Sequence, residues 1–404
     1  MELKKRYLDF IHLIGPGIIT AALVFGPGSL TIASKLGGQF QYNLLWVIVL
    51  ATFFMIVFTV MTTRYGFVSQ NSLIESIRNR HGKAVSTFVG ISIFVVSISF
   101  QSGNAIGAGL AFASLFNTSP IPWIICFSIL AITTLFFRSF YKILEKMMIV
   151  LILIMLLSFL ITVLISSPDL SLVVKGFVPR LPKGSELLTI AIIASSFSIT
   201  GAFYQSYLVQ EKNQSARGIK TSIKESISGI LILGIVSSMV LISAGAVLYT
   251  NKISINTAAD MGKALEPLFG SASFIVFMIG LFAASFSSLI GNATLGGVIL
   301  ADTLSLGKKL SDWSVRLLII TLIITGSVIA ILFSDLRLQL IVFAQGFTIL
   351  IVPFIGFFIL RITSKYQIMG EYKNSVLTKI LGTSGLILLL GLACGYGYLL
   401  FLKN

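Results

Sequence analysis

Eleven long apolar stretches follow one another along the chain, and short segments that hold most of the charged residues separate them. They span residues 11–35, 41–66, 84–115, 120–137, 143–166, 186–210, 225–250, 267–302, 315–335, 337–362 and 377–402. A helix needs roughly 20 apolar residues to cross a bilayer, and each stretch has about that length or more. We therefore predict an all-α integral membrane protein with eleven transmembrane helices.

The composition supports a single polytopic domain over residues 1–404. Hydrophobic residues make up 56% of the chain, charged residues make up 11%, and the mean hydropathy is +1.00. A soluble chain carries about 25% charged residues, so this chain cannot cover a water-facing surface. The lipid bilayer is an expected partner, and we expect the basic N-terminal segment to remain attached ahead of the first helix.

The net charge of +15 would raise the question of a nucleic-acid partner in a soluble protein, but here the basic residues lie in the loops. If the N-terminus is cytoplasmic, 21 of the 29 Lys and Arg residues fall on the cytoplasmic side. Basic residues accumulate on that side in membrane proteins. We predict a multi-pass protein of the cell membrane with a cytoplasmic N-terminus, an outside C-terminus and no nucleic-acid partner.

Charged and metal-binding side chains are absent from the middle of the predicted helices. None of the 14 acidic residues lies there, and the two histidines, His12 and His81, lie at a helix entrance and in a loop. Cys126 and Cys394 lie inside apolar stretches, which indicates packing. The sequence contains no catalytic constellation, ATP-binding loop or cofactor motif. We therefore expect a protein that is not an enzyme, with no metal site of charged ligands, no cofactor and no obligate protein partner.

Two of the predicted helices are interrupted near their middle, and we expect the first to be unwound at about 25–29 and the sixth at about 198–202. Residues 25–29 of the first read Phe-Gly-Pro-Gly-Ser, and residues 195–202 of the sixth place four hydroxyls and a glycine together. Either segment alone is also consistent with a kink or with hydrogen bonds between helices. Matched breaks in two halves, however, indicate a transporter with a substrate site at the midplane. The predicted site residues are Gly26, Gly28, Ser29, Thr31, Ser198, Thr200, Gly201 and Ala202.

The matched breaks divide the chain into two repeats, over about 11–166 and 186–362, followed by an extra helix at 377–402. Polar residues on the remaining helices are candidates to line the substrate path, although such residues also commonly link helices. These candidates are Asn104, Tyr204, Gln205, Ser288, Asn292 and Gln345.

Several segments follow one another in a characteristic order. They include the Gly15-Pro16-Gly17 triplet, the break in the first helix, residues 207–210, the serine-rich segment 284–297, and residues 345–353 and 369–374. In these segments the chain resembles the NRAMP family of divalent metal transporters. The resemblance covers the first ten helices and implies a LeuT-like inverted repeat of helices 1–5 and 6–10, with helices 1 and 6 broken.

The metal ligands of the family do not carry over to this sequence. The family has Asp-Pro-Gly-Asn in the first helix, where this chain reads Gly26-Pro27-Gly28-Ser29. Its Met-Pro-His in the sixth helix aligns with residues 198–200, which read Ser-Ile-Thr, and a second family histidine aligns with Gln205. The resemblance thus implies the scaffold without the Asp, Asn, Met and His side chains.

A site without carboxylates is better suited to a small anion than to a divalent cation, because half-helix N-termini present N–H groups and partial positive charge. No buried Arg or Lys is available for a doubly charged anion. We therefore expect a secondary transporter of a small inorganic ion, with bicarbonate as first candidate and chloride or nitrate next. The alternatives are a divalent cation transporter of relaxed specificity for Mg²⁺ or Mn²⁺, and a transport-dead sensor or interaction protein, which the short loops disfavour.

Overall fold

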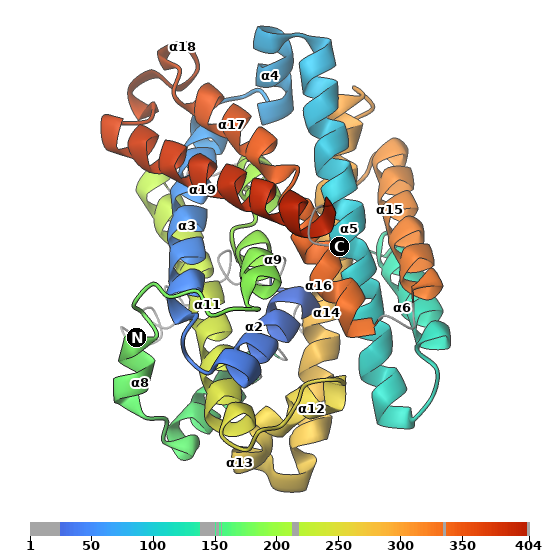
Figure 1. Cartoon of the computed structure of the whole chain (residues 1–404). Helices are drawn as coiled ribbons and strands as arrows, with labels where there is room; N and C mark the ends of the chain where they lie inside the picture. The colour runs from blue at the N-terminus through green and yellow to red at the C-terminus, as the bar shows by residue number, and fades with distance from the viewer. Residues whose placement is uncertain are drawn as a thin grey trace, which may run out of the picture.

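The computed structural model describes residues 25–137, 150, 153–154, 156–211, 218–333 and 337–401, and throughout these residues the regular structure is helical (Figure 1). The first half of the predicted first helix and most of the first half of the fifth lie outside the described residues, as do the Gly15-Pro16-Gly17 triplet and His12.

The longer helices follow the predicted order along the chain. Their bounds are α2 Pro27–Phe40, α3 Leu45–Val68, α4 Leu73–His81, α5 Lys83–Phe116, α6 Pro120–Thr134, α9 Glu186–Ser196, α10 Ile199–Glu211, α11 Ile219–Ala244, α14 Ser273–Thr303, α15 Trp313–Leu332, α16 Arg337–Thr348, α17 Val352–Thr363 and α19 Val376–Phe401. Shorter helices in the connections are α8 Leu170–Lys175, α12 Ala258–Gly262, α13 Glu266–Phe269 and α18 Tyr366–Met369.

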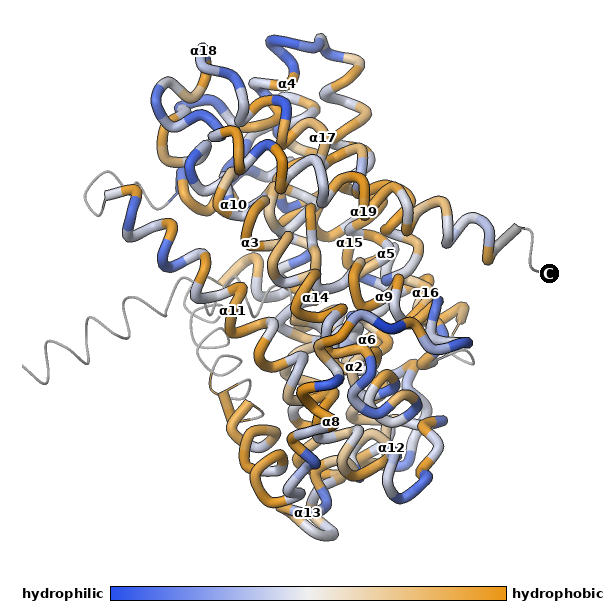
Figure 2. Tube along the Cα trace, turned by 60° about the vertical axis from the view of Figure 1, so that its left-hand side comes forward, coloured by the Kyte–Doolittle hydropathy of each residue, from blue (hydrophilic) through white to orange (hydrophobic). Residues whose placement is uncertain are grey.

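The described helices account for all eleven predicted stretches. Eight helical segments are long and apolar enough to cross a membrane, and two shorter apolar helices, Pro120–Thr134 and Leu156–Ser166, lie in the fourth and fifth stretches. α2 begins in the second half of the first stretch and continues five residues beyond its predicted end. Hydrophilic residues gather around α4 and α18 at one end of the molecule and around α12 near the other (Figure 2). The protein is therefore a multi-pass membrane protein.

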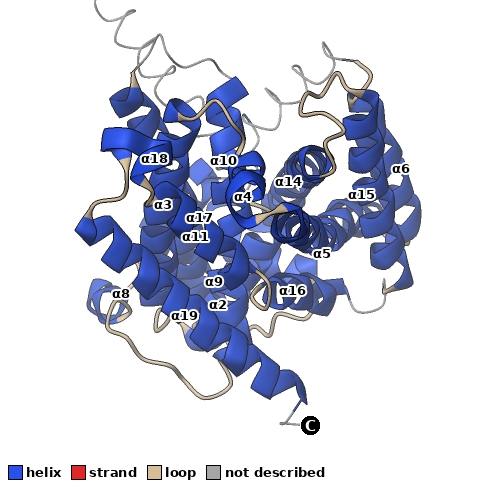
Figure 3. Cartoon of the chain, turned by 90° about the horizontal axis from the view of Figure 1, so that it is seen from above, coloured by secondary structure: helices blue, strands red, loops and turns tan. Residues whose placement is uncertain are grey.

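The core of the bundle is formed by α5 and α14, which pack along each other, with α15 and α16 also against α5. A second group packs around α3, which contacts α10 and α11 (Figure 3). Gly107 of α5 shows how close the helices approach, because a Cβ there would lie 2.5 Å from Ser285 Oγ and 2.6 Å from Pro27 Cβ. Small residues at such points allow membrane helices to pack closely.

The tenth predicted helix is interrupted, which the sequence analysis did not predict. α16 ends at Thr348, residues 349–351 form turns, and α17 begins at Val352. Pro353 lies in the first turn of α17, where its missing N–H costs no helical hydrogen bond. The two halves have different neighbours: α16 packs against α5, α9 and α2, whereas α17 packs against α3 and α19.

A candidate ion-binding pocket between the broken helices

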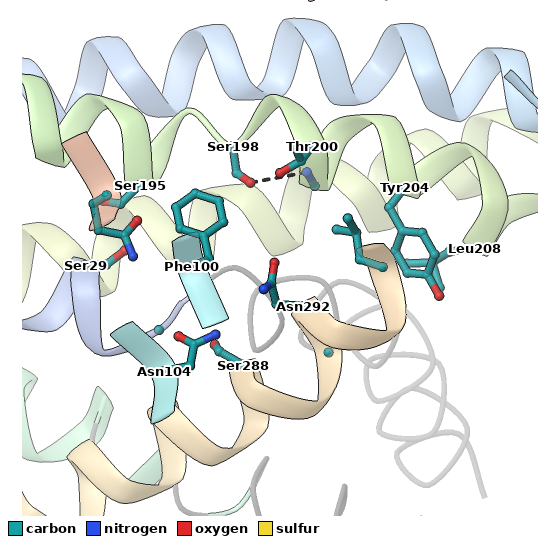
Figure 4. Close-up of a pocket in the computed structure, with 15 residues that line it drawn as sticks. Ser29, Phe100, Asn104, Ser195, Ser198, Thr200, Tyr204, Leu208, Ser288 and Asn292 are labelled. Atoms are coloured by element: carbon teal, nitrogen blue, oxygen red, sulfur yellow. Dashed lines mark hydrogen bonds between the residues drawn. The ribbon is translucent and has the colours of Figure 1, made fainter. Parts of the chain in front are cut away.

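A pocket of about 580 Å³, including space that is open to solvent, lies where the two breaks meet α5, α14 and α16 (Figure 4). Nine of its fifteen lining residues have polar side chains, and none is charged. The residues are Gly26, Ser29, Phe100, Asn104, Ser195, Ser198, Thr200, Gly201, Tyr204, Leu208, Ser288, Gly291, Asn292, Leu295 and Gln345. Five separate stretches of the chain thus contribute to one site, as expected for a site at the centre of a transporter.

The break in the sixth helix is shorter than predicted. α9 ends at Ser196, Phe197 and Ser198 are not helical, and α10 begins at Ile199. The expectation of an unwound segment over 198–202 is therefore wrong for residues 199–202. The helix restarts early because Ser198 Oγ accepts a 3.2 Å hydrogen bond from the Gly201 N–H, as an N-cap serine does.

Phe197 anchors this break in the core. Its ring lies 5.4 Å from the Phe58 ring and 5.8 Å from the Phe54 ring, both on α3. Its N–H donates to the Ile193 carbonyl at 2.7 Å and closes the last turn of α9. The chain therefore turns from α9 into α10 around a fully buried aromatic side chain.

At the break in the first helix, Phe25 and Gly26 are not helical, and α2 begins at Pro27. The prediction of unwinding over 25–29 is wrong for residues 27–29, because Pro27 is favourable in the first turn of a helix. Ser288 Oγ donates to the Phe25 carbonyl at 3.2 Å. A Cβ on Gly26 would lie 3.1 Å from Asn104 Oδ1 and 3.2 Å from Ser288 Oγ, so only glycine allows this approach without displacement.

The structure brings together ten of the fourteen residues predicted for the site and the path. Gly26, Ser29, Ser198, Thr200, Gly201, Asn104, Tyr204, Ser288, Asn292 and Gln345 line the pocket.

The other four predicted residues do not line the pocket. Gln345 covers Gly28, where an added Cβ would overlap its side chain. Thr31 and Ala202 are fully buried in helices, and the Ala202 N–H donates to the Ser198 carbonyl. Gln205 lies on α10, and its Nε2 donates to Ser226 Oγ of α11 at 2.9 Å. Gln205 therefore links two helices, the alternative role for polar residues in a bundle.

Asn292 has both roles considered for the polar residues, since it lines the pocket and also links α14 to α5. Its Nδ2 donates to the Ser97 carbonyl at 2.8 Å and to Gln101 Oε1 at 3.1 Å. Gln101 in turn donates through Nε2 to the Leu289 carbonyl at 2.8 Å. These contacts leave the Asn292 amide nitrogen directed at α5.

The pocket contains hydroxyl and amide groups but no formal charge. None of its fifteen lining residues carries a carboxylate, imidazole, ammonium, guanidinium or thiol group. Ser29 is 1% exposed and its Oγ has no hydrogen-bond partner in the structure. Within the part of the chain that the structure describes, no group of three or more His, Cys, Asp and Glu side chains is placed to hold a metal ion.

The sequence analysis missed five lining residues: Phe100, Ser195, Leu208, Gly291 and Leu295. Ser195 was visible as part of the interrupted segment, and Leu295 lies one helical turn beyond Gly291 on α14. The apolar members carried no signal, because they resemble every other apolar residue of a membrane helix.

A cluster of polar residues at the C-terminal end of α14 joins α10 to the rest of the bundle. Tyr207 Oη donates to Asp302 Oδ2 at 2.6 Å. Lys308 Nζ lies 3.9 Å from Asp302 Oδ1 and 2.6 Å from Glu75 Oε1. Arg78 of α4 donates to the carbonyls of Asp302 and Thr303 at 2.7 and 2.8 Å. The Asp302 carbonyl also accepts from the Ser305 N–H at 3.0 Å, so Arg78 adds a side-chain donor at a helix end where backbone donors become scarce.

Comparison with known proteins supports the family resemblance across nearly the whole chain. A profile described as "Natural resistance-associated macrophage protein-like" matches residues 17–398. The chain is 25% identical over 396 residues to the divalent metal cation transporter MntH of Yersinia pestis, covering 95% of this chain and 93% of that protein. It is 24% identical to the natural resistance-associated macrophage protein 2 homolog of Dictyostelium discoideum, and spans 62% of that relative's length.

Solved structures agree with the fold. The manganese transporter of Eremococcus coleocola superposes with a TM-score of 0.80 at 21% identity, covering 96% of this chain and 86% of that one. Mhp1, a nucleobase-cation-symport-1 family transporter, superposes with a TM-score of 0.59 at 14% identity, covering 95% of this chain and 91% of that one. The predicted LeuT-like fold is confirmed, and this chain belongs to the NRAMP family of membrane transporters.

Proposed function

We propose that this protein is a secondary transporter that moves a small inorganic ion by alternating access through the pocket between the two breaks. The pocket lies at the junction of the paired half-helices, where transporters of this architecture bind their substrates. The orientation with a cytoplasmic N-terminus and an outside C-terminus is part of this proposal and is supported by the distribution of basic residues.

The pocket chemistry supports a small monovalent anion as the ion, with bicarbonate as first candidate. The observation that carries this proposal is the absence of any carboxylate, imidazole or thioether among the fifteen lining residues. Hydroxyl and amide groups, including Ser29, Thr200 and Asn104, can donate hydrogen bonds to an oxyanion. The first-turn N–H groups of α10 add partial positive charge, although Ser198 already occupies the Gly201 N–H.

The comparisons support a second candidate, a divalent cation held with relaxed specificity. The Yersinia pestis relative is named a divalent metal cation transporter, and the structure of highest TM-score quoted above is that of a manganese transporter. Mg²⁺ usually keeps several waters, and the oxygens of Ser29, Asn104 and Gln345 are available for contact with such a hydrated ion. We place the anion first, because Mg²⁺ and Mn²⁺ sites ordinarily include carboxylates and the scaffold alone does not bind an ion.

Flux measurements in proteoliposomes separate the two candidates. An internal pH reporter follows bicarbonate movement, and internal Mg²⁺ and Mn²⁺ indicators follow the cations. The matched variants are Gly26→Asp, which places a carboxylate in the pocket, and Gly26→Ala, which adds a methyl group alone beside Asn104 and Ser288.

An anion transporter should lose bicarbonate flux in Gly26→Asp well beyond the loss in Gly26→Ala. A cation transporter should gain cation binding in Gly26→Asp instead. If the internal pH does not respond to bicarbonate and the unmodified protein takes up Mg²⁺ or Mn²⁺, the second candidate is established and the first is excluded.

A further inference from the structure

A basic surface lies at the C-terminal end of α17, where α4 and α18 meet it (Figure 1). We define it by Arg80, Arg361, Lys365 and Lys373. Arg80 of α4 donates to Gln367 Oε1 of α18 at 2.9 Å. Lys373 Nζ lies 5.2 Å from the centre of the Tyr366 ring. Three of the four side chains are exposed, and Lys365 is half-buried.

Three of these cations, Arg80, Arg361 and Lys365, lie close enough to His81 to act on its charge. Burial lowers the pKa of His81, and the charges of Arg361, Arg80 and Lys365 lower it further. His81 ends α4 and its ring makes an edge-to-face contact with Phe358 of α17, with ring centres 5.4 Å apart. The three cations therefore act on one point between α4 and α17.

Within the described part of the chain, no carboxylate forms an ion pair with a cation of this basic surface. Among the described residues the ion pairs join Lys263 to Asp260 and Lys308 to Glu75 and Asp302. None of the four cations of the basic surface takes part in them. Glu371 is exposed in the short 3₁₀-helix Gly370–Tyr372 and forms no ion pair with a described cation. Like charges repel one another, so an anion bound among them would be stabilised.

A line of aromatic rings leads from the basic surface towards the lipid-facing side of α5. Phe358 lies 5.0 Å from Phe354, and Phe354 lies 4.7 Å from Phe88, measured between ring centres. Phe88 is 58% exposed. The site therefore combines a cationic end and an apolar flank, which is the pattern of an amphiphile with an anionic head.

We propose that the basic surface and the rings of Phe88 and Phe354 bind an anionic phospholipid, while the buried Phe358 supports Phe354 from behind. The phosphate lies among the cations, and an acyl chain lies along Phe88. In the predicted orientation this site faces the cytoplasmic leaflet, where basic pockets between membrane helices bind anionic head groups. The lipid lies across α5 and α17, which also contact each other directly through Phe88 and Phe354.

Free phosphate is disfavoured as the occupant because it would use only the cations and would leave Phe88 in contact with neutral lipid. The two sources predict different results. A phospholipid site depends on both the cations and the rings, whereas a phosphate site depends on the cations alone.

Native mass spectrometry of the full chain measures this directly, with phosphatidylglycerol, phosphatidylcholine and inorganic phosphate as probes. The test variant is Arg361→Gln/Lys373→Gln, in which both residues are exposed. The control is Lys175→Gln/Lys252→Gln, which removes two exposed charges from the opposite end of the molecule. A third variant, Phe88→Ser, removes the exposed ring. Thermal unfolding in phosphatidylcholine verifies that all variants are folded.

The unmodified protein and the control should retain phosphatidylglycerol in preference to phosphatidylcholine. The test variant should bind phosphatidylglycerol roughly tenfold more weakly, because each basic side chain near an anionic surface contributes a substantial attraction. Phe88→Ser should weaken phosphatidylglycerol binding without changing any binding of phosphate. If the test and control variants retain phosphatidylglycerol equally, the basic residues only set the orientation in the membrane. If inorganic phosphate binds as well as phosphatidylglycerol, the site binds a free anion. Either result overturns the proposal.

Discussion

Tyr207 on α10 and Asp302 at the end of α14 are 95 residues apart in sequence, yet their side chains share a 2.6 Å hydrogen bond in a buried position. α10 is the half-helix that follows the break, and α14 belongs to the central pair of helices. The bond therefore fixes the far end of a pocket-lining half-helix to the core of the bundle.

Removing the Tyr207 hydroxyl should destabilise the protein. A hydrogen bond to a charged group contributes about 1.5–3 kcal/mol, so Tyr207→Phe should lower the thermal unfolding midpoint, and Asp302→Asn should do so too by weakening the contact with Lys308. Tyr398→Phe, on an exposed part of α19, is the control. If Tyr207→Phe unfolds like the control, the bond does not stabilise α10.

Gly28 and Gln345 should behave as a coupled pair. A methyl group at Gly28 would overlap the Gln345 side chain, and overpacking typically costs about 1–3 kcal/mol. Gly28→Ala should therefore reduce stability and ion flux, and adding Gln345→Ala should restore stability by vacating the space. Gly391→Ala is the control, since a Cβ there meets no atom within 4 Å. Additive effects of the two substitutions would contradict this coupling.

Variants at Ser198 should separate helix capping from pocket charge. Ser198→Ala removes the oxygen that accepts the Gly201 N–H and should cost about 1 kcal/mol. Ser198→Asn and Ser198→Asp both keep a capping oxygen, so both should retain stability. For an anion substrate, flux should fall in Ser198→Asp but not in Ser198→Asn. Retained anion flux in Ser198→Asp would place the anion elsewhere.

Mn²⁺ should bind this protein far more weakly than an NRAMP protein that has the family's Asp, Asn and Met. The lining residues supply no carboxylate or thioether, and these are ligands that such ions use. Isothermal titration calorimetry on the purified protein measures the affinity. Micromolar Mn²⁺ binding that disappears in Ser29→Ala would contradict the anion proposal and support the cation candidate.

Glu75 should make the stability of α4 depend on pH in the acidic range. Burial raises the pKa of Glu75, but hydrogen bonds from Lys308 and the Ser72 N–H, with the charges of Lys308 and Arg78, lower it below its usual value. A lowered pKa adds stability that is present above the unfolded-state pKa of about 4.3 and is lost as pH falls through the folded-state value. Glu75→Gln should therefore lower the unfolding midpoint at pH 7 and make little difference near pH 3. A difference that persists at pH 3 would assign the effect to packing.

The order of the helices was predictable because length and apolarity define a membrane span, and the described helices lie in all eleven stretches. The ends of the breaks were not. Ser198 was predicted to lie in unwound chain together with the next four residues, but its hydroxyl caps a helix that restarts at once. Capping depends on the rotamer of one side chain. A hydropathy pattern contains no information on rotamers, so it could not predict where the helix restarts.

The pocket residues, too, were only partly predictable from the sequence. Polar residues such as Asn104 and Ser288 stand out in an apolar helix, so they were predictable as candidates. Whether each lines the pocket depends on helix rotation, and Gln205 turns towards Ser226 of α11 instead. Phe100 and Leu295 line the pocket without any signal in the sequence, because their neighbours are equally apolar.

The interruption at 349–351 divides the tenth span into two short helices that can change their relative angle at these three residues. The twelve residues of α16 extend for about 18 Å, so this helix crosses only part of the bilayer. α16 packs against α5, α9 and α2, whereas α17 packs against α3 and α19, so the two helices have separate supports. We expect α16 to tilt about residues 349–351 and to move Gln345 away from the ion while α17 stays in place. A movement of α16 alone would then open the pocket on one side.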